Sequence, residues 1–342
     1  MAKPPAELDK LLERLEGRIA AAFAASIQDM RDAVNFTALI AHLRAGNTEA
    51  VMRALNLQPD MFGPLDAAIS EGLADGGRYE IGNHKVPDPD GVGQFVLRFD
   101  GRALRAEAWA REHSSKLIVE ILKDQREMVR SVIRDEIEQG VNPRQTALEL
   151  VGRVDRVTGR RRGGFIGLTS QEAGYVSNAR QQLVSGSPVD LRAYLERRAR
   201  DKRFDRHVQR ALDTGEPIPS QAVDRMVERY KDRLLKVRGD RIARTEALSS
   251  LNAGRKEGFA QLVEKSGVPS DKVVKVWDAT GDGRTRDTHI GMDGQSKPLD
   301  EPFVSTNGHR LQFPGDASLG APGAETIQCR CWVKYRIDYL AE

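Results

Sequence analysis

Both cysteines of this 342-residue chain lie in the stretch ETIQCRCWVKY, one residue apart. In an extended segment, residues i and i+2 point to the same side, so the thiols of Cys329 and Cys331 would lie side by side. A disulfide between them would close a short and strained loop. With His289 they supply three ligands of the kind that zinc prefers, and His309 or an acidic residue such as Asp282 could supply a fourth.

Three interpretations of these residues remain open. The spacing is not one of the CxxC patterns that identify a zinc site, so zinc is the one cofactor to consider and none is certain. Two small apolar side chains packed in a sheet would give the same pattern, because free cysteines are among the most buried residues. A nucleophilic cysteine paired with His289 is the third interpretation, but no acyl or phosphoryl pocket can be identified in the sequence.

A second charged group lies in DGRTRDTH, which contains Asp282, Arg284, Arg286 and His289. If Arg284 to Ile290 is extended, Arg284 and Arg286 share one face and His289 lies on the other. Such a strand is costly to bury unless its charges are paired. An EF-hand calcium loop is excluded here, because the acidic spacing and the final Glu are wrong.

The stretch RIARTEALSSLN, expected to be helical, contains Arg241, Arg244, Glu246 and Asn252. Arg241 and Arg244 share a helix face by their i,i+3 spacing, and Glu246 is off that face. The two arginines would either bind a carboxylate or phosphate with paired hydrogen bonds, or join an ion-pair network that anchors the helix to acidic residues of DGRTRDTH. We favour the network, because small domains with modest cores often use such residues to hold the fold together.

Positive charge gathers in the middle of the chain. The formal net charge is +3, but residues 151–250 contain 22 Lys and Arg against 13 Asp and Glu. The stretch RAYLERRARDKRFDRHVQR is the densest, and its candidate DNA contacts are Arg197, Arg198, Arg200, Lys202, Arg203 and Arg206. It is either a solvated helix with i,i+4 ion pairs, which the charge count favours, or a surface for a phosphate backbone or an acidic partner.

Apolar periodicity predicts helices over most of the chain. Residues 1–75 are a helical region, in which Asn47 is a helix N-cap. Residues 76–140 contain a hairpin-like excursion over 78–99 and then a long helix. Residues 141–238 are a basic helical region, in which TGRRRGGFIG is a flexible loop.

The pattern changes after about residue 239. A helix over 239–266 and strands at KVVKVWDAT, HRLQF and CRCWVKYRI predict a small α+β C-terminal domain, residues 239–342. The fold class is therefore α+β, with mostly helical N-terminal and middle regions. No apolar run approaches the ~20 residues that span a bilayer, and the N-terminus does not have the pattern of a secretory signal, so we expect no membrane partner.

Several motifs of the C-terminal region occur in a characteristic order. They are RIARTEALSSLNAGRKEG, KVWDATGDGRTRDTHIGMDGQ, LDEPF, LQFPGD and APGAETIQCRCWVKY. In this order they resemble the phage Mu F-like family of minor head, or head morphogenesis, proteins. The similarity covers about Gly239 to Tyr335, roughly a third of the chain.

The resemblance implies a low-copy virion protein in the head, near the portal, that acts in procapsid assembly and in DNA packaging or ejection. Its implied partners are the phage portal protein, the major capsid or scaffold protein and, in one interpretation, packaged double-stranded DNA. Assembly would take place in the cytoplasm of the bacterial host. No agreed catalytic activity belongs to the family, so we do not expect an enzyme.

Two alternatives remain beside that implied function. One is a DNA-binding virion protein that uses the basic segment 151–250. The other is a zinc-dependent nuclease or hydrolase, which would need an open coordination position and a general base. The sequence has neither a Walker loop nor a recognisable catalytic triad, so the enzyme ranks last.

Overall fold

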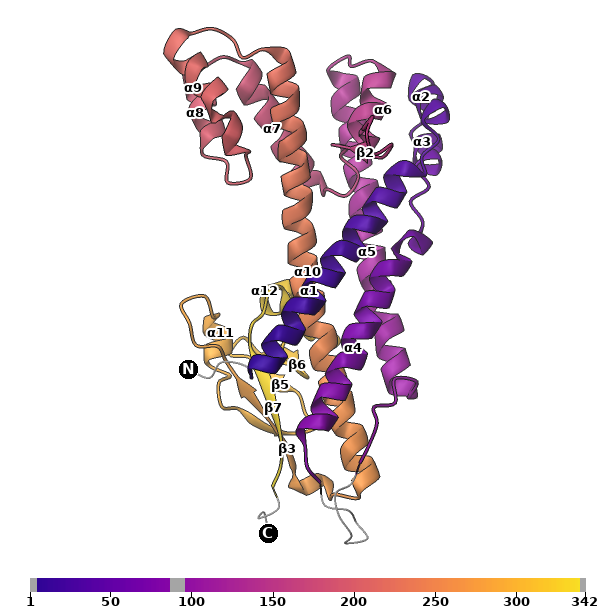
Figure 1. Ribbon diagram of the computed structural model, residues 1–342, viewed down its shortest axis with the longest axis vertical. Coiled ribbons are helices and arrows are strands. Elements are labelled where there is room, and N and C mark those ends of the chain that lie inside the picture. The colour runs from indigo at the N-terminus through magenta and orange to yellow at the C-terminus, as the bar shows by residue number, and fades with distance from the viewer. Residues whose placement is uncertain (1–4, 87–95, 339–342) are drawn as a thin grey trace. The chain divides into compact units, whose positions relative to one another are not determined.

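The computed structural model describes residues 5–86 and 96–338, and confirms the α+β class (Figure 1). The α-helices are α1 (Ala6–Asp32), α2 (Phe36–Arg44), α3 (Thr48–Ala54), α4 (Gly63–Asn83), α5 (Leu104–Glu138), α6 (Pro143–Val151), α7 (Ser170–Val184), α8 (Pro188–Leu195), α9 (Asp205–Thr214), α10 (Ser220–Ser266), α11 (Asp287–Ile290) and α12 (Gly323–Thr326). The strands are β1 (Arg153–Val154), β2 (Arg161–Arg162), β3 (Val273–Asp278), β4 (Ser296–Pro298), β5 (Phe303–Val304), β6 (Arg310–Leu311) and β7 (Trp332–Ile337). Within these ranges, no helix combines the length and the apolar character needed to cross a bilayer.

The described residues form two units, each discontinuous in sequence. The sheet unit comprises residues 5–23, 64–86, 96–115 and 240–338, and the helical unit comprises residues 24–63 and 116–239. Helices α1, α5 and α10 contribute residues to both units. The boundary at Gly239 lies one residue from the predicted start of the C-terminal domain, whereas the four consecutive regions expected from the sequence remain a prediction.

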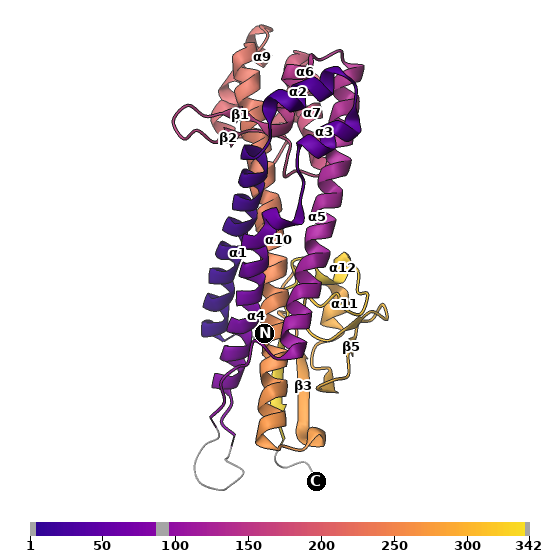
Figure 2. The same ribbon diagram turned by 90° about the vertical axis from the view of Figure 1, so that its right-hand side faces the viewer.

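The sheet unit is built around a three-stranded antiparallel sheet in the order β4-β3-β7. The sheet lies beside the C-terminal part of α10 in both ribbon views (Figures 1 and 2). In β3, buried and partly exposed residues alternate, and Val273, Lys275 and Trp277 are the buried ones. Strands β5 and β6 pair separately. The KVVKVWDAT and HRLQF strands are confirmed, and the third predicted strand begins only at Trp332, after both cysteines.

Glycines allow α4 and α10 to approach each other within the sheet unit. A Cβ added to Gly254 would lie 1.9 Å from the carbonyl oxygen of Leu73, and one added to Gly76 would lie 2.1 Å from that of Leu251. These distances are below any van der Waals contact, so only glycine fits where the two backbones meet. This contact fixes α10 against α4 along the part of α10 that faces the sheet.

Within the predicted flexible loop, residues 163–167 are instead buried in the helical unit, so the prediction was wrong for those residues. Arg31 donates from Nη2 to the carbonyl oxygens of Gly164, at 2.9 Å, and Ile166, at 2.5 Å. Gln125 accepts from the Gly167 amide at 2.6 Å and donates to the carbonyl of Leu168 at 3.0 Å. Buried polar side chains thus satisfy this irregular backbone, and the sequence pattern does not reveal such distant partners.

The predicted hairpin-like excursion over 78–99 was wrong at its start. Helix α4 continues to Asn83, and Glu80 and Ile81 lie on its buried face. Tertiary packing therefore outweighs the β preference of Tyr79 and Ile81. Residues 96–99 form no strand, and the Pro, Asp and Gly cluster of the expected hairpin falls within 87–95, outside the described residues.

Candidate metal centre

His289 lies on a one-turn helix, not on the extended strand considered from the sequence. The turn before α11 forms because the Asp282 side chain accepts a hydrogen bond from the Arg284 amide at 3.0 Å, and the Asp282 backbone carbonyl accepts one from the Thr285 amide at 2.9 Å. A short acidic side chain that bonds to the backbone two residues on competes with strand formation. The His289 side chain is buried, and its ring lies edge-on to Trp277 with the centroids 5.2 Å apart.

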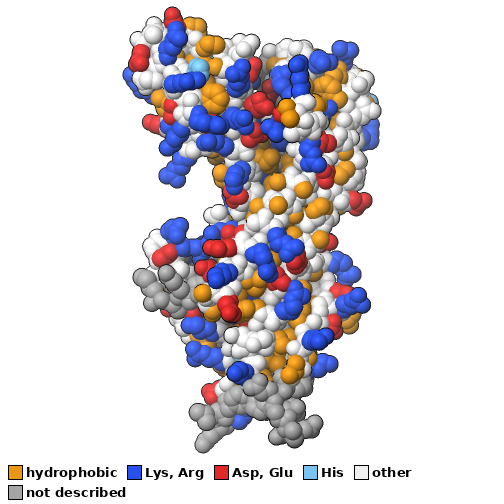
Figure 3. Space-filling view, in the orientation of Figure 1, with side chains coloured by type: hydrophobic (Ala, Val, Ile, Leu, Met, Phe, Trp, Pro, Cys, Tyr) orange, Lys and Arg blue, Asp and Glu red, His pale blue; other side chains and the backbone are white. Residues whose placement is uncertain are grey.

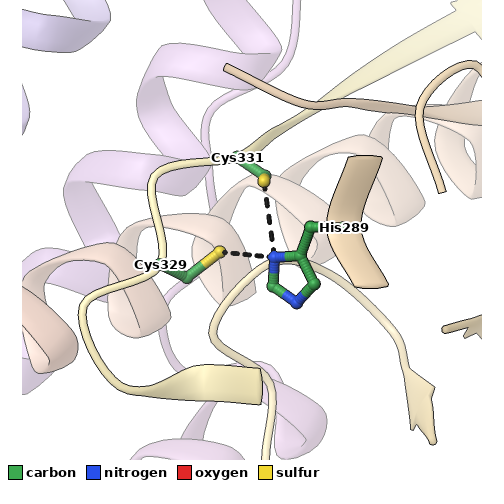
Figure 4. Close-up of side chains that lie close together, drawn as sticks. All are labelled: His289, Cys329 and Cys331. Carbon is green, nitrogen blue, oxygen red and sulfur yellow. Dashed lines mark hydrogen bonds between the residues drawn. The ribbon is translucent and has the colours of Figure 1, made fainter. Parts of the chain in front are cut away.

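Cys329 and Cys331 lie between α12 and β7, and their side chains converge on His289 (Figure 4). Each Sγ is 3.5 Å from Nδ1 of His289. One ligand atom from each residue lies within 4.8 Å of the others, and all three side chains are buried. The structure thus brings together the three residues singled out as candidate ligands, although 40 residues separate His289 from Cys329.

Glu325, at the end of the same stretch as the cysteines, contacts the opposite edge of the His289 ring. Its Oε2 is 3.0 Å from Nε2 of His289, out of line for a hydrogen bond. Thr288 donates to Oε2 at 2.9 Å, and Ser305 donates to Oε1 at 3.2 Å. His309 Nδ1 is 3.0 Å from Oε1. Four neighbours therefore hold this carboxylate in place.

The two thiols differ in acidity. The hydrogen bond to Cys331 lowers the pKa of Cys329, against the effect of its burial. The same hydrogen bond and burial raise the pKa of Cys331. In this arrangement of side chains, Cys329 thus ionises more readily than Cys331. A cation coordinated between them would hold both as thiolates.

Neither residue considered as a fourth ligand joins this cluster. His309 is bound to Glu325. Asp282 binds Arg330 with two hydrogen bonds, one of them from Nη1 to Oδ2 at 2.6 Å, and these hold the pKa of Asp282 well below its usual range. Arg330 stands between the two cysteines in sequence, so this ion pair anchors their segment beside the turn that precedes α11.

The carboxylate of Asp282 pairs with Arg330, so a network that joins Arg241 and Arg244 to the acidic residues of DGRTRDTH stays a prediction. Arg244 lies 3.9 Å from Glu16 on α1, and Arg241 is exposed on α10. Arg284 is also exposed, 3.9 Å from Asp282.

Three other motif residues make specific contacts within the sheet unit. Glu246 is 2.5 Å from Nε2 of His113 on α5, and Asn252 donates to the carbonyl of Pro314 at 3.0 Å. Arg286 donates to the carbonyl of Ile327, which ties the start of α11 to the segment that carries the cysteines. These three residues therefore link helices and loops of the sheet unit.

Sequence reasoning missed Arg255, which is buried on α10 three residues after Asn252. It donates to Glu80 on α4 at 2.7 Å, to the carbonyl of Val333 on β7 at 2.7 Å and to Asn252 at 3.2 Å. Burial alone would raise the pKa of Glu80, but Arg255 and His84 outweigh it, so the net pKa is lowered. Arg255 lies inside the quoted motif RIARTEALSSLNAGRKEG, but nothing there indicates a partner 175 residues away.

The basic stretch of the helical unit is divided between engaged and exposed side chains. Arg197 donates to Gln182 at 2.8 Å, Arg200 pairs with Asp205 at 3.0 Å, and Arg203 pairs with Asp201 at 2.6 Å. The other three candidates, Arg198, Lys202 and Arg206, are exposed. Lys and Arg side chains gather over α8 and α9 on the face drawn in Figure 3. These contacts are not the i,i+4 pairs of a continuous helix, because the stretch is interrupted between α8 and α9.

Comparison with known proteins finds a family match over one continuous segment, which contains many of the residues described above. The family model described as Phage Mu protein F like protein matches residues 202–334, which include the exposed Lys202 and Arg206, all of α10 and the cluster of His289, Cys329 and Cys331. The match begins about 40 residues earlier than the similarity noted from the motifs.

Two curated relatives share part of the chain. The minor head protein GP7 of Bacillus phage SPP1 is 33% identical over 119 residues, which are 35% of this chain and 35% of that protein. The NAD(+)--arginine ADP-ribosyltransferase EFV of Enterococcus faecalis (strain ATCC 700802 / V583) is 32% identical over 101 residues, which are 30% of this chain and 19% of that protein. The chain thus matches about a third of the length of the minor head protein and about a fifth of the length of the transferase.

No solved structure gives a significant match to this chain. The assignment therefore depends on sequence: the ordered C-terminal motifs, the family match over 202–334 and the similarity to a minor head protein. Through this segment the chain is similar to the phage Mu protein F-like family.

Proposed function

We propose that this chain is a minor structural protein of a bacteriophage head that acts in head morphogenesis. The observation that carries the proposal is its 33% identity over 119 residues to the minor head protein of phage SPP1. The family match over residues 202–334 supports it.

Within the virion we place the chain in the head, near the portal and in few copies. Its partners in this proposal are the portal protein and the major capsid or scaffold protein, with assembly in the cytoplasm of the bacterial host. The resemblance of the ordered C-terminal motifs to head morphogenesis proteins supports this placement, and DNA packaging or ejection is the step that a protein near the portal would affect.

The role we propose is structural, not enzymatic. The polar motif residues Glu246, Asn252 and Arg286 are hydrogen-bonded to other elements of the sheet unit. Perturbed or paired residues of this kind often stabilise a fold without taking part in catalysis. The similarity to the ADP-ribosyltransferase covers 19% of that enzyme, a share too small to support a transferase activity for this chain.

Sedimentation of proheads tests the proposed location. Proheads of the phage that encodes the chain would be assembled with and without the portal protein, each in the presence of the tagged chain, and separated on a density gradient. We expect the chain to sediment with the portal-containing proheads and to stay at the top of the gradient when the portal is omitted. Equal amounts of the chain in both prohead preparations would contradict a position near the portal. Absence of the chain from both preparations would contradict the proposal that it is a head protein.

A second candidate function is contact with packaged DNA through α8, α9 and the turn between them. The observation that favours it is that Arg198, Lys202 and Arg206 are exposed, whereas the other three candidate cations are engaged by acidic or polar neighbours. Exposed cations that remain free to approach phosphates supply the salt-dependent part of DNA affinity.

Neutralising these three residues together is expected to weaken DNA binding and its salt dependence. In the variant Arg198→Gln, Lys202→Gln, Arg206→Gln, the slope of log affinity against log salt should become shallower by about 2–3, since each phosphate contact contributes ~0.9. The measurement is fluorescence anisotropy with duplex DNA over a range of salt. A matched control removes three exposed cations elsewhere: Lys10→Gln, Arg53→Gln and Arg111→Gln. Equal slopes in the two variants would contradict the DNA surface.

A further inference from the structure

We propose that Cys329, Cys331 and His289 form a binding site for a tetrahedral, thiolate-preferring divalent cation, of which zinc is the type, with Nδ1 as the ligating nitrogen of His289. The cluster lies in the family-matched segment, but the proposal depends only on its geometry and chemistry and is independent of the function in the phage head.

The distances match those that a tetrahedral zinc ion would impose. Zinc lies about 2.3 Å from a thiolate and about 2.0–2.1 Å from an imidazole nitrogen, which places the two ligand atoms about 3.6 Å apart at a tetrahedral angle. Both Sγ atoms are 3.5 Å from Nδ1 of His289. Both thiol-to-imidazole distances are therefore already those of two edges of such a coordination sphere.

Hydrogen bonding explains this arrangement less well than a shared cation does. A ring nitrogen offers either one lone pair or one proton, so Nδ1 can form one full hydrogen bond and not two. Two sulfur atoms nevertheless converge on it at the same distance (Figure 4). The two cysteines are free thiols. A cation between the three atoms gives each of them a partner.

The second ring nitrogen of His289 lies beside a carboxylate, as it does in many metal sites. A metal-bound histidine usually presents its other ring nitrogen to a carboxylate or a carbonyl, which fixes the tautomer and the orientation of the ring. Nε2 of His289 is buried without a hydrogen bond, 3.0 Å from Oε2 of Glu325. Thr288 and Ser305 hold that carboxylate. Glu325 is therefore the positioning residue of the site, and a small rotation of the His289 ring would complete its hydrogen bond.

The donor set selects the class of ion. Two thiolates and a neutral imidazole suit zinc and other borderline or soft cations, and they disfavour magnesium and calcium, which prefer oxygen ligands. Two thiolate charges also balance a divalent charge, as a buried ion requires. Among the described residues no fourth His, Cys, Asp or Glu joins the cluster, so a solvent molecule is the fourth ligand in this proposal. The ion would join α11 to the segment between α12 and β7.

Cobalt titration of the full chain tests the site. Protein freed of metal by a chelator under reducing conditions would be titrated with cobalt(II) and then with zinc. We expect one cobalt ion per chain, thiolate-to-cobalt charge-transfer absorption in the near ultraviolet, strong d–d bands typical of tetrahedral coordination, and displacement of cobalt by zinc. Absence of stoichiometric binding, or binding without the thiolate bands, would overturn the proposal without the use of any variant.

Variants then assign the ligands. Cys329→Ser, Cys331→Ser and His289→Ala should each weaken cobalt binding by more than the ~10–100-fold that loss of an orienting partner costs, and Glu325→Gln should fall within that range and keep the stoichiometry. His309→Ala is the matched control, since His309 also contacts Glu325 but lies outside the cluster, and we expect wild-type stoichiometry and thiolate bands. Wild-type affinity in either serine variant would overturn the assignment.

Discussion

Replacing Arg255 by leucine is expected to lower the free energy of unfolding of the sheet unit by about 3–5 kcal/mol, because it removes the guanidinium that pairs with the buried Glu80 carboxylate and leaves His84 as the neighbour that still contacts it. Glu80 is 1% exposed, and Arg255 donates to it at 2.7 Å. The same guanidinium satisfies the carbonyl of Val333, so a backbone acceptor also loses its donor. A buried group left without its partner costs more than the pair contributes when it is intact.

Tryptophan fluorescence during denaturant unfolding reports specifically on the unfolding of the sheet unit. All three tryptophans, Trp109, Trp277 and Trp332, belong to the sheet unit. Arg105→Leu is the matched control, because Arg105 pairs with Glu257 and Glu264 at the surface of the same unit, and exposed pairs contribute about 0–1 kcal/mol. An equal loss of stability in the two variants would show that Arg255 is not the central contact of the unit.

The second large effect is a pH dependence of stability that comes from Lys275. This lysine is fully buried on the central strand β3, where its Nζ donates to the carbonyl and to the side-chain oxygen of Gln312 at 3.0 and 2.8 Å. Burial, with a smaller effect from Lys256, lowers the pKa of Lys275 from 10.5 to about 7. The folded state therefore releases this proton at a lower pH than the unfolded state does.

Stability should rise with pH between about pH 7 and pH 10, because over that interval the unfolded state binds more protons than the folded state. The contribution of Lys275 is a slope of about 1.4 kcal/mol per pH unit, or roughly 4 kcal/mol over the interval. Below pH 7 both states hold the proton and the contribution to the slope vanishes. Lys275→Met removes the titrating group, so the difference in unfolding free energy between wild type and this variant should change by that amount.

The check is denaturant unfolding at a series of pH values, followed by tryptophan fluorescence. Lys334→Met provides the control, since Lys334 is an exposed lysine on the neighbouring strand β7. We expect its stability profile to run parallel to that of the wild type from pH 7 to pH 10. If the Lys275→Met profile also runs parallel to the wild type, the buried lysine does not titrate in this range.

Local signals in the sequence predicted helix ends and strands well. Thr169 and Glu172 form a capping box at the start of α7, and the Asn47 side chain accepts from the Ala50 amide at the start of α3. Gly140 lies just beyond the end of α5, in a left-handed conformation with φ of 66°. These features depend on residues within one turn of each other, so the sequence contains all that determines them.

Contacts between distant segments could not be predicted in the same way. The pairing of Arg255 with Glu80 joins residues 175 positions apart, and the partner of Asp282 is Arg330, not an arginine of α10. Any of the many charged residues would have satisfied the same pattern. The buried segment 163–167 was mispredicted for the same reason, because the side chains that satisfy its backbone belong to α1, α5 and α10.

The candidate metal centre was predictable in part. Residue type and the i,i+2 spacing were enough to name Cys329, Cys331 and His289. The conformation around His289 was not, because the turn formed by Asp282 replaces the strand. The role of Glu325 could not be inferred either, since a single acidic residue in a stretch of mixed polarity has no distinguishing spacing.

Quantitative mass spectrometry of purified particles tests most directly the proposal that this chain is a minor component of a phage head. Heads separated from tails would be digested, and peptides of the chain counted against those of the major capsid protein. We predict that the chain is present in the head fraction at a small fraction of the capsid protein's abundance, and that it is depleted from the tails. Its absence from heads of the phage that encodes it would contradict this account.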